Sequence, residues 1–278
     1  MKQRLITALG IFLFGLPLLL LSEYIIYPIA LGIISAIAVF ELLRVLGVHR
    51  EYFISLPAYI IAILLPVFSH SSFVPEYRQQ NYLLVIALAL FGYLMWLAGS
   101  AVLSRGRITY DSIAGAFLAV TYVTVSFTSL SLIRYMDNGV YFFGLVFVGA
   151  WMCDTFAYFT GMLFGKHKLA PELSPKKTVE GSVGGIVFAI IGCVVYGAVI
   201  ELVSEVDADY LILALTGLFL SVVAQIGDLF ASLIKREHGI KDYSKLLPGH
   251  GGIMDRFDSI LAVSTVLLAI CFLCPPFN

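Results

Sequence analysis

Charge is scarce in this chain of 278 residues: Asp, Glu, Lys and Arg together make up 13% of it, against about 25% in soluble globular domains. Hydrophobic residues make up 60%, and the mean hydropathy is +0.96. A soluble enzyme needs more polar surface than this, so that class is excluded. The chain also lacks polar low-complexity tracts, which excludes a disordered protein, and we expect no nucleic-acid partner. An integral membrane protein is the class that fits.

Cysteine is scarce too. The four cysteines lie in or beside apolar runs, and no Cys/His grouping has the spacing of zinc ligands, so we interpret them as packing residues. Internal repeats are also lacking, which weighs against a transporter built from inverted repeats.

Apolar runs dominate what is present. A span of about 17–25 residues crosses a bilayer core of roughly 30 Å, and counting such runs predicts an all-α polytopic integral membrane protein with about nine transmembrane helices. The predicted spans are 5–22, 24–46, 53–68, 82–103, 112–132, 140–165, 181–203, 210–234 and 257–274.

The basic residues orient these spans. With nine spans and the N-terminus inside, only Arg78 and Arg134 of the 17 basic residues lie outside. Basic residues collect on the cytoplasmic side of membrane proteins, so we expect the N-terminus inside and the C-terminus outside.

The two halves of the chain differ in their ionisable residues. We expect 1–135 to form a transmembrane scaffold of about five helices. We expect 139–278 to form a catalytic region of about four helices, with cytoplasmic loops at 165–181 and 235–256. Glu41 is the exception in the scaffold, and we interpret it as structural, either reaching to the membrane surface or pairing with Arg44.

Three aspartates of the second half, Asp154, Asp228 and Asp258, lie within or at the ends of apolar helices. A carboxylate at the centre of a membrane helix costs about 2.5–3.5 kcal/mol on insertion scales, so each is a candidate functional residue. On the eighth span, helical spacing places Asp228 on one polar stripe. The stripe comprises Ser221, Gln225, Asp228, Ser232 and Lys235. The stripe either holds neighbouring helices together through buried hydrogen bonds or forms part of a functional site.

Paired carboxylates follow this stripe. Asp255 and Asp258 are three residues apart at the start of the ninth span, hence on one helical face. Mg²⁺ prefers hard oxygen ligands and usually shares one or two carboxylates with substrate phosphates. The pair therefore predicts a Mg²⁺ site that Asp228 completes from the neighbouring helix. Whether a second cation accompanies Mg²⁺ is left open.

The loop before this pair has the composition of a phosphate-binding segment. Gly249, Gly251 and Gly252 allow backbone N–H groups to approach phosphate oxygens. Lys241, Lys245 and Arg256 add cations. His250 contacts phosphate, acts as a general base, or only caps backbone groups within the turn. Together these features predict phosphoryl or nucleotidyl transfer.

The other inner loop carries Ser174, Lys176 and Lys177 with Glu180. Two adjacent cations and hydroxyl groups suit a triphosphate, and the alternative is a loop whose lysines only anchor it inside. Upstream, Asp154 and Tyr158 lie one helical turn apart, on a face that Gly161 and Gly165 continue. A closely packed helix lining a polar cavity has this pattern, and we expect Asp154 and Tyr158 to contact substrate there.

The segment 232–258 resembles the signature of the phosphatidate cytidylyltransferase (CDP-diacylglycerol synthase) family. The matching residues are Ser232, Lys235, Arg236, Lys241, Asp242, Ser244, Leu247, Pro248, His250, Gly251, Gly252, Asp255, Arg256 and Asp258. The stretches DTFAYFTG at 154–161 and SPKKTVEG at 174–181 are also similar to the family's. The likeness is strong in the C-terminal half and rests on hydropathy alone in the N-terminal half.

This resemblance implies transfer of a cytidylyl group from CTP to phosphatidic acid, giving CDP-diacylglycerol and pyrophosphate with Mg²⁺. It implies that Asp228, Asp255 and Asp258 hold the metal. It implies that the substrate phosphate groups are bound by Lys235, Arg236, Lys241 and Arg256. It implies that substrate also contacts Ser232, His250, Gly251 and Gly252. It further implies a homodimer in the bacterial inner membrane with the site facing the cytoplasm. An ion-coupled secondary transporter and a CTP-dependent lipid kinase remain the alternatives.

Overall fold

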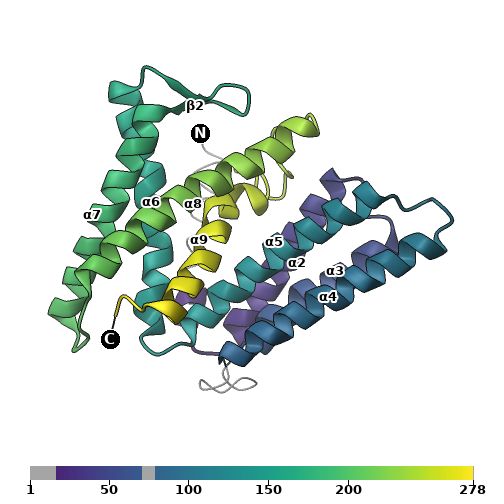
Figure 1. Ribbon diagram of the computed structural model, residues 1–278, viewed down its shortest axis with the longest axis horizontal. Helices are drawn as coiled ribbons and strands as arrows, with labels where there is room; N and C mark the ends of the chain where they lie inside the picture. The colour runs from purple at the N-terminus through teal and green to yellow at the C-terminus, as the bar shows by residue number, and fades with distance from the viewer. Residues whose placement is uncertain (1–16, 71–78, 278) are drawn as a thin grey trace. The chain divides into compact units, whose positions relative to one another are not determined.

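The computed structural model describes residues 17–70 and 79–277. Helices form most of this part of the chain (Figure 1). They are α2 (Ile26–Val45), α3 (Tyr52–Phe68), α4 (Gln79–Leu103), α5 (Tyr110–Arg134), α6 (Gly139–Phe164), α7 (Val179–Val203), α8 (Tyr210–Glu237) and α9 (Met254–Leu273). Seven are long and apolar enough to cross a membrane, and α3 has only 17 residues. The all-α polytopic membrane class is therefore confirmed.

The predicted second to ninth spans each coincide with one of these helices. The first predicted span, 5–22, lies mostly outside the described residues. The count of nine and the sidedness of the two termini therefore stay predictions.

Several helix starts follow from local chemistry. Thr109 caps α5, Thr178 caps α7 and Asp209 caps α8. In each case the side-chain oxygen accepts a hydrogen bond from the backbone N–H three residues on. Such a cap satisfies one of the donors that the first turn of a helix leaves without a partner. The caps fix where three of the apolar runs become helical.

Contacts divide the chain into two compact units. The first comprises Met1–Tyr135 and Ile240–Arg256, and the second comprises Met136–Gly239 and Phe257–Asn278. The first turn of α9 thus groups with the first unit and the rest of that helix with the second.

In the first unit, α2 packs against α3 and α5, and α4 packs against α3 and α5 (Figure 1). The α2–α3 contact is close because Gly32 has no side chain: a Cβ there would lie 2.7 Å from the carbonyl oxygen of Ile63. Leu84, Leu88 and Phe91 of α4 are exposed. In a membrane such residues face lipid without cost, which explains a helix with so little of its surface buried.

In the second unit, α7 packs against both α6 and α8. Glycines again permit the approach, since a Cβ at Gly185 would lie 2.8 Å from the carbonyl oxygen of Cys153 on α6. Likewise a Cβ at Gly217 of α8 would lie 2.7 Å from the Cα of Ile190 on α7. Small residues at helix contacts are how membrane helices approach one another.

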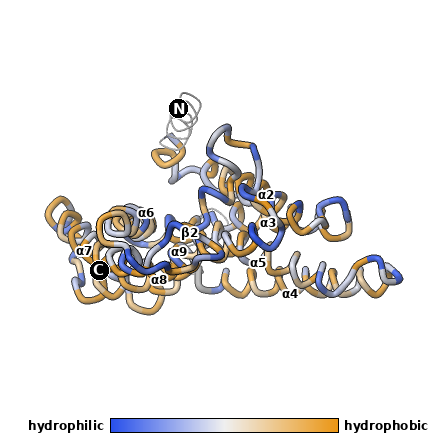
Figure 2. Tube along the Cα trace, turned by 90° about the horizontal axis from the view of Figure 1, so that it is seen from above, coloured by the Kyte–Doolittle hydropathy of each residue, from blue (hydrophilic) through white to orange (hydrophobic). Residues whose placement is uncertain are grey.

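A small hairpin joins α6 to α7. Strand β1 (Lys168–Ala170) pairs antiparallel with β2 (Ser174–Thr178). Sequence alone predicts only a loop here. Glu180, in the first turn of α7, accepts hydrogen bonds from the backbone N–H groups of Lys166 (3.0 Å) and His167 (3.2 Å), which closes the base of the hairpin. Figure 2 shows hydrophilic residues gathered in this hairpin, whereas the helices are mainly hydrophobic.

Candidate active site

The polar stripe of α8 begins as a buried seam. Ser221 donates a hydrogen bond to the carbonyl oxygen of Leu218 on its own helix (2.8 Å). Gln225 is 8% exposed. Its amide donates to the carbonyl oxygen of Ser182 on α7 (3.3 Å), and the Ser182 hydroxyl donates to its Oε1. This part of the stripe therefore holds α7 and α8 together through hydrogen bonds, as the structural interpretation predicted.

Further along the stripe, charged groups from four elements meet around Asp228. Lys177 of β2 forms an ion pair with its carboxylate. Asp258 of α9 is in hydrogen-bond contact with Asp228, and Lys235 interacts electrostatically with Asp258. Asp154 of α6 interacts electrostatically with both Asp228 and Lys177. We call these five residues the aspartate cluster.

Ser259 forms hydrogen bonds with two members of the cluster, Asp154 and Asp258, and it is not among the residues predicted from the sequence. Its hydroxyl donates to Asp154 Oδ2 (3.2 Å), and its backbone N–H donates to Asp258 Oδ1 (2.9 Å). A serine beside an aspartate at a helix start reads as capping, so the sequence holds no separate signal for this role.

The aspartate cluster contains carboxylate oxygens, the kind of ligand that Mg²⁺ prefers. Asp228 and Asp258 bring two carboxylates within hydrogen-bond reach of each other, and the repulsion between two negative charges at this distance favours binding of a cation beside them. Within residues 17–70 and 79–277, no group of three or more His, Cys, Asp or Glu side chains is placed to hold a metal ion. Mg²⁺ usually keeps water or substrate phosphates as its other ligands, so the two carboxylates fit.

Asp255 is engaged in the first unit. It is 8% exposed, and its Oδ2 accepts hydrogen bonds from the backbone N–H groups of Tyr243 (2.8 Å) and Gly252 (2.9 Å). The carboxylate thereby links the beginning and the end of the loop before α9. Its predicted part in metal binding stays a prediction.

The hairpin brings the predicted triphosphate residues to different places. Lys177 lies in the aspartate cluster, whereas Lys176 is exposed. Ser174 pairs with Ala170 across the hairpin. Arg236, at the end of α8, donates through Nε to the carbonyl oxygen of Leu173 (3.3 Å), which ties the hairpin to that helix. On α8, Ser232 is buried and faces inward on the same stripe.

Tyr158 is 67% exposed. Its neighbours on the same face of α6 show why that face is close-packed: a Cβ at Gly161 would lie 2.9 Å from the Thr178 hydroxyl oxygen. The predicted close packing of this face is therefore present at Gly161, whereas Tyr158 is exposed. Its predicted contact with substrate stays a prediction.

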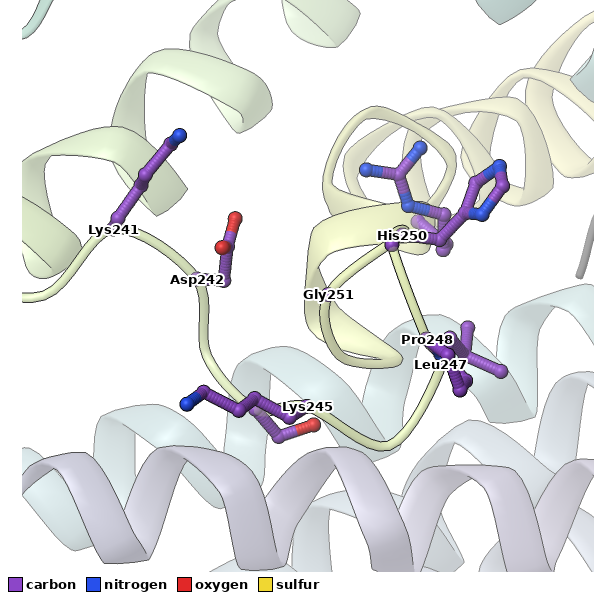
Figure 3. Close-up of a pocket in the computed structure, with 10 residues that line it drawn as sticks. Lys241, Asp242, Lys245, Leu247, Pro248, His250 and Gly251 are labelled. Carbon is purple, nitrogen blue, oxygen red and sulfur yellow. The ribbon is translucent and has the colours of Figure 1, made fainter. Parts of the chain in front are cut away.

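The segment 240–253, which we call the glycine loop, lines an open cavity of about 700 Å³ in the first unit (Figure 3). The residues that line it are Lys241, Asp242, Ser244, Lys245, Leu247, Pro248, Gly249, His250 and Gly251 of the loop together with Arg256 of α9. Figure 3 shows Lys241 and Lys245 on one arm of the loop and His250 on the other. Three cations and a histidine around one cavity suit an anionic ligand.

The conformation of the glycine loop depends on its turn. Leu247 and Gly251 exchange backbone hydrogen bonds of 2.9 and 3.1 Å, and the backbone N–H of His250 also donates to the carbonyl oxygen of Leu247 (2.8 Å). Gly251 has φ +85°, which favours glycine. Within the part of the chain that the structure describes, Nδ1 of His250 is buried without a hydrogen-bond partner.

The loop also corrects the interpretation of Glu41. Glu41 is 1% exposed, so its carboxylate is not solvated, and it accepts hydrogen bonds from the glycine loop. Arg44 instead donates to the carbonyl oxygen of Tyr243. The sequence marks Glu41 as an ionisable residue in an apolar helix, but its partners lie about 200 residues away.

The chain matches the cytidylyltransferase family over residues 2–274. A phosphatidate cytidylyltransferase of Bacillus subtilis (strain 168) is 38% identical over 271 residues, covering 96% of each chain. Proteins of the same name from Staphylococcus epidermidis (strain ATCC 12228 / FDA PCI 1200) and Staphylococcus aureus (strain COL) are 35% and 34% identical, each covering 96% of this chain and 97% of the relative. These matches confirm the resemblance seen in the signature, and the chain belongs to the cytidylyltransferase family.

Proposed function

We propose that this membrane protein is a phosphatidate cytidylyltransferase, which transfers a cytidylyl group from CTP to phosphatidic acid. The relatives that match over 96% of the chain carry that name. The observation that carries the proposal is the aspartate cluster, in which Asp228 and Asp258 meet beside Lys177. Nucleotidyl transfer requires carboxylates that hold a metal and cations that neutralise phosphate charge, and the cluster supplies both.

In this proposal Asp228 and Asp258 would hold Mg²⁺, and Asp255 is the third carboxylate of the set predicted from the sequence. When bound, Mg²⁺ neutralises charge on the CTP phosphates and orients them for attack. Lys177 and Lys235 lie against the two carboxylates and place positive charge where the phosphate groups bind. Asp154 and Ser259 keep these side chains in position.

The bond changes make few demands on acid–base catalysis. A phosphate oxygen of phosphatidic acid attacks the α-phosphorus of CTP. The bond between the α-phosphorus and the oxygen that bridges it to the β-phosphorus breaks, and pyrophosphate leaves. The nucleophile is already an anion, so positioning and charge neutralisation contribute more than deprotonation. His250 therefore serves as a substrate contact rather than a general base. Lys241, Lys245 and Arg256, which line the glycine-loop cavity, bind anionic groups of the substrates and neutralise their charge.

The remaining partners follow from this chemistry. One substrate is a membrane lipid and the other a soluble nucleotide, so the site faces an aqueous compartment at a membrane surface. We assign it to the cytoplasmic face of the bacterial inner membrane because the basic loops are predicted to lie inside. A homodimer remains part of the proposal.

The test is release of pyrophosphate by the purified protein in mixed micelles with CTP and Mg²⁺. We expect release only when the micelles contain phosphatidic acid, and none with diacylglycerol, which lacks the nucleophilic phosphate. Pyrophosphate release that is equal with the two lipids, or absent with both, would contradict the proposal.

A further inference from the structure

Glu41 is a buried carboxylate that accepts hydrogen bonds from three donors in or beside the glycine loop. It lies near the end of α2 and is 1% exposed. Its Oε1 accepts from the Ser244 hydroxyl and from the backbone N–H of Ile253 (3.1 Å), and its Oε2 accepts from the backbone N–H of Met254 (2.9 Å). A buried carboxylate is tolerated only when such donors replace its lost hydration.

These contacts reach both ends of the loop that lines the cavity. Ser244 precedes the turn, whereas Ile253 and Met254 follow it. Gly252 allows the approach, because a Cβ there would lie 2.6 Å from Cδ of Glu41. Both arms of the loop are thus fixed to one point on α2, and Lys245 and His250 lie between the two fixed positions.

We propose that Glu41 is a positioning residue, which holds the glycine loop in the conformation that presents Lys245 and His250 to the anionic substrate. The proposal rests on the proposed function for its kinetic consequence. Its structural part rests only on the contacts of Glu41. Glu41 itself does not line the cavity.

A glutamine cannot replace this carboxylate, although it has the same shape. If the amide oxygen takes the place of Oε2, the NH₂ group faces the backbone N–H of Ile253. If the oxygen takes the place of Oε1, the NH₂ group faces the backbone N–H of Met254. Either orientation leaves one backbone donor of the loop opposite another donor, which is costly when buried. The Ser244 hydroxyl, which also accepts from the backbone N–H of Leu246 (3.1 Å), could accept from the amide through its second lone pair, but the backbone donor opposite the NH₂ group would still lose its acceptor.

Two measurements on Glu41→Gln test the proposal, with Ser35→Ala as the matched control. Ser35 is fully buried on the same helix and lies outside the loop. The first measurement is hydrogen–deuterium exchange of the full-length protein in detergent. We expect faster exchange in peptides covering 240–254 of Glu41→Gln, with α3 and α5 unchanged, and no change in Ser35→Ala.

The second measurement is the kinetics of the same variants. We expect kcat/KM for CTP to fall about 10- to 100-fold in Glu41→Gln, the scale of losing a charge-assisted hydrogen bond that orders a reacting group. Ser244→Ala removes one donor and leaves both backbone donors satisfied, so it should lose less. A merely structural role of Glu41 predicts a lower melting temperature with kcat/KM unchanged in the protein that remains folded.

The outcomes separate this proposal from the function. Unchanged exchange of 240–254 in Glu41→Gln would overturn the positioning role, whatever the activity. Wild-type kcat/KM in Glu41→Gln, beside an active wild-type protein, would overturn it as well. An inactive wild-type protein would count against the proposed function alone, and the exchange data would still decide whether Glu41 holds the loop.

Discussion

Lys177 of the hairpin forms an ion pair with Asp228 of α8, and about three quarters of each side chain is buried (25% and 27% exposed). The pair joins a lysine that the sequence suggests for CTP to a carboxylate that it suggests for Mg²⁺. Nucleotide and metal are therefore expected to depend on each other at this point, because both interact with one of the two partners.

The hairpin lysines are predicted to bind CTP. In the Lys176→Gln, Lys177→Gln double variant we expect the KM for CTP to rise about 10-fold or more, since two charge-assisted contacts to phosphate are lost. The KM for phosphatidic acid should change less. Steady-state kinetics in mixed micelles measure both values.

Lys168→Gln is the control, because Lys168 is exposed on the neighbouring strand. If the lysines only anchor the loop inside, the double variant will keep the wild-type KM for CTP and will show reduced insertion or yield instead.

The metal carboxylates give a second prediction. Asp228→Asn and Asp258→Asn retain the shape of the side chain and remove its charge, so Mg²⁺-dependent turnover should fall by about 10²-fold or more. The same loss is predicted for Asp255→Asn. Turnover is measured across a Mg²⁺ titration on protein that inserts and purifies normally.

Asp207→Asn controls for the loss of one carboxylate, since Asp207 is exposed in the segment before α8. Near-wild-type turnover at saturating Mg²⁺ in any of the three variants would remove that residue from the metal site.

The membrane spans were predictable because hydropathy and length act locally. Eight runs became helices near the expected limits, and the period of the α8 stripe correctly placed Ser221, Gln225 and Asp228 toward other helices. No local signal predicts the partners of Glu41, since its contacts join residues 203 to 213 positions apart. They depend on tertiary packing, which a single sequence does not encode in its periodicity.

The β1–β2 hairpin was not predicted from the sequence, for a different reason. Its strands are short and rich in lysine, so neither alternation nor β-propensity marks them. They are fixed by Glu180, whose carboxylate accepts from two backbone N–H groups and from the His167 ring (2.6 Å). The sequence shows Glu180 as one more acid in a basic loop.

Close packing of α6 on α7 predicts a stability effect. Gly185→Ala places a Cβ 2.8 Å from the backbone oxygen of Cys153, and the helices must separate to admit it. We expect a loss of about 1–3 kcal/mol in stability, seen as a lower melting temperature in detergent. Gly92→Ala should cause no loss, because nothing lies within 4 Å of the new Cβ. Equal melting temperatures for the two variants would contradict the packing.

The sidedness of the membrane is tested by chemical labelling. In a variant without the native cysteines, a cysteine replacing Glu205 should react with a membrane-impermeant reagent added to intact cells. A cysteine replacing Lys245 should react only after the membrane is opened. This pattern follows from the distribution of basic residues. The reverse pattern would overturn both the number of spans and the cytoplasmic assignment of the glycine loop.

The central claim is that the α-phosphorus of CTP is transferred to phosphatidic acid, and it is tested by following label from CTP into lipid. The purified protein is incubated with phosphatidic acid, Mg²⁺ and CTP labelled at either the α- or the γ-phosphorus. We predict labelled lipid from α-labelled CTP only, with the γ-label recovered in pyrophosphate. Label in lipid from the γ-position would show a lipid kinase, and no label in lipid from either position would contradict group transfer to phosphatidic acid altogether.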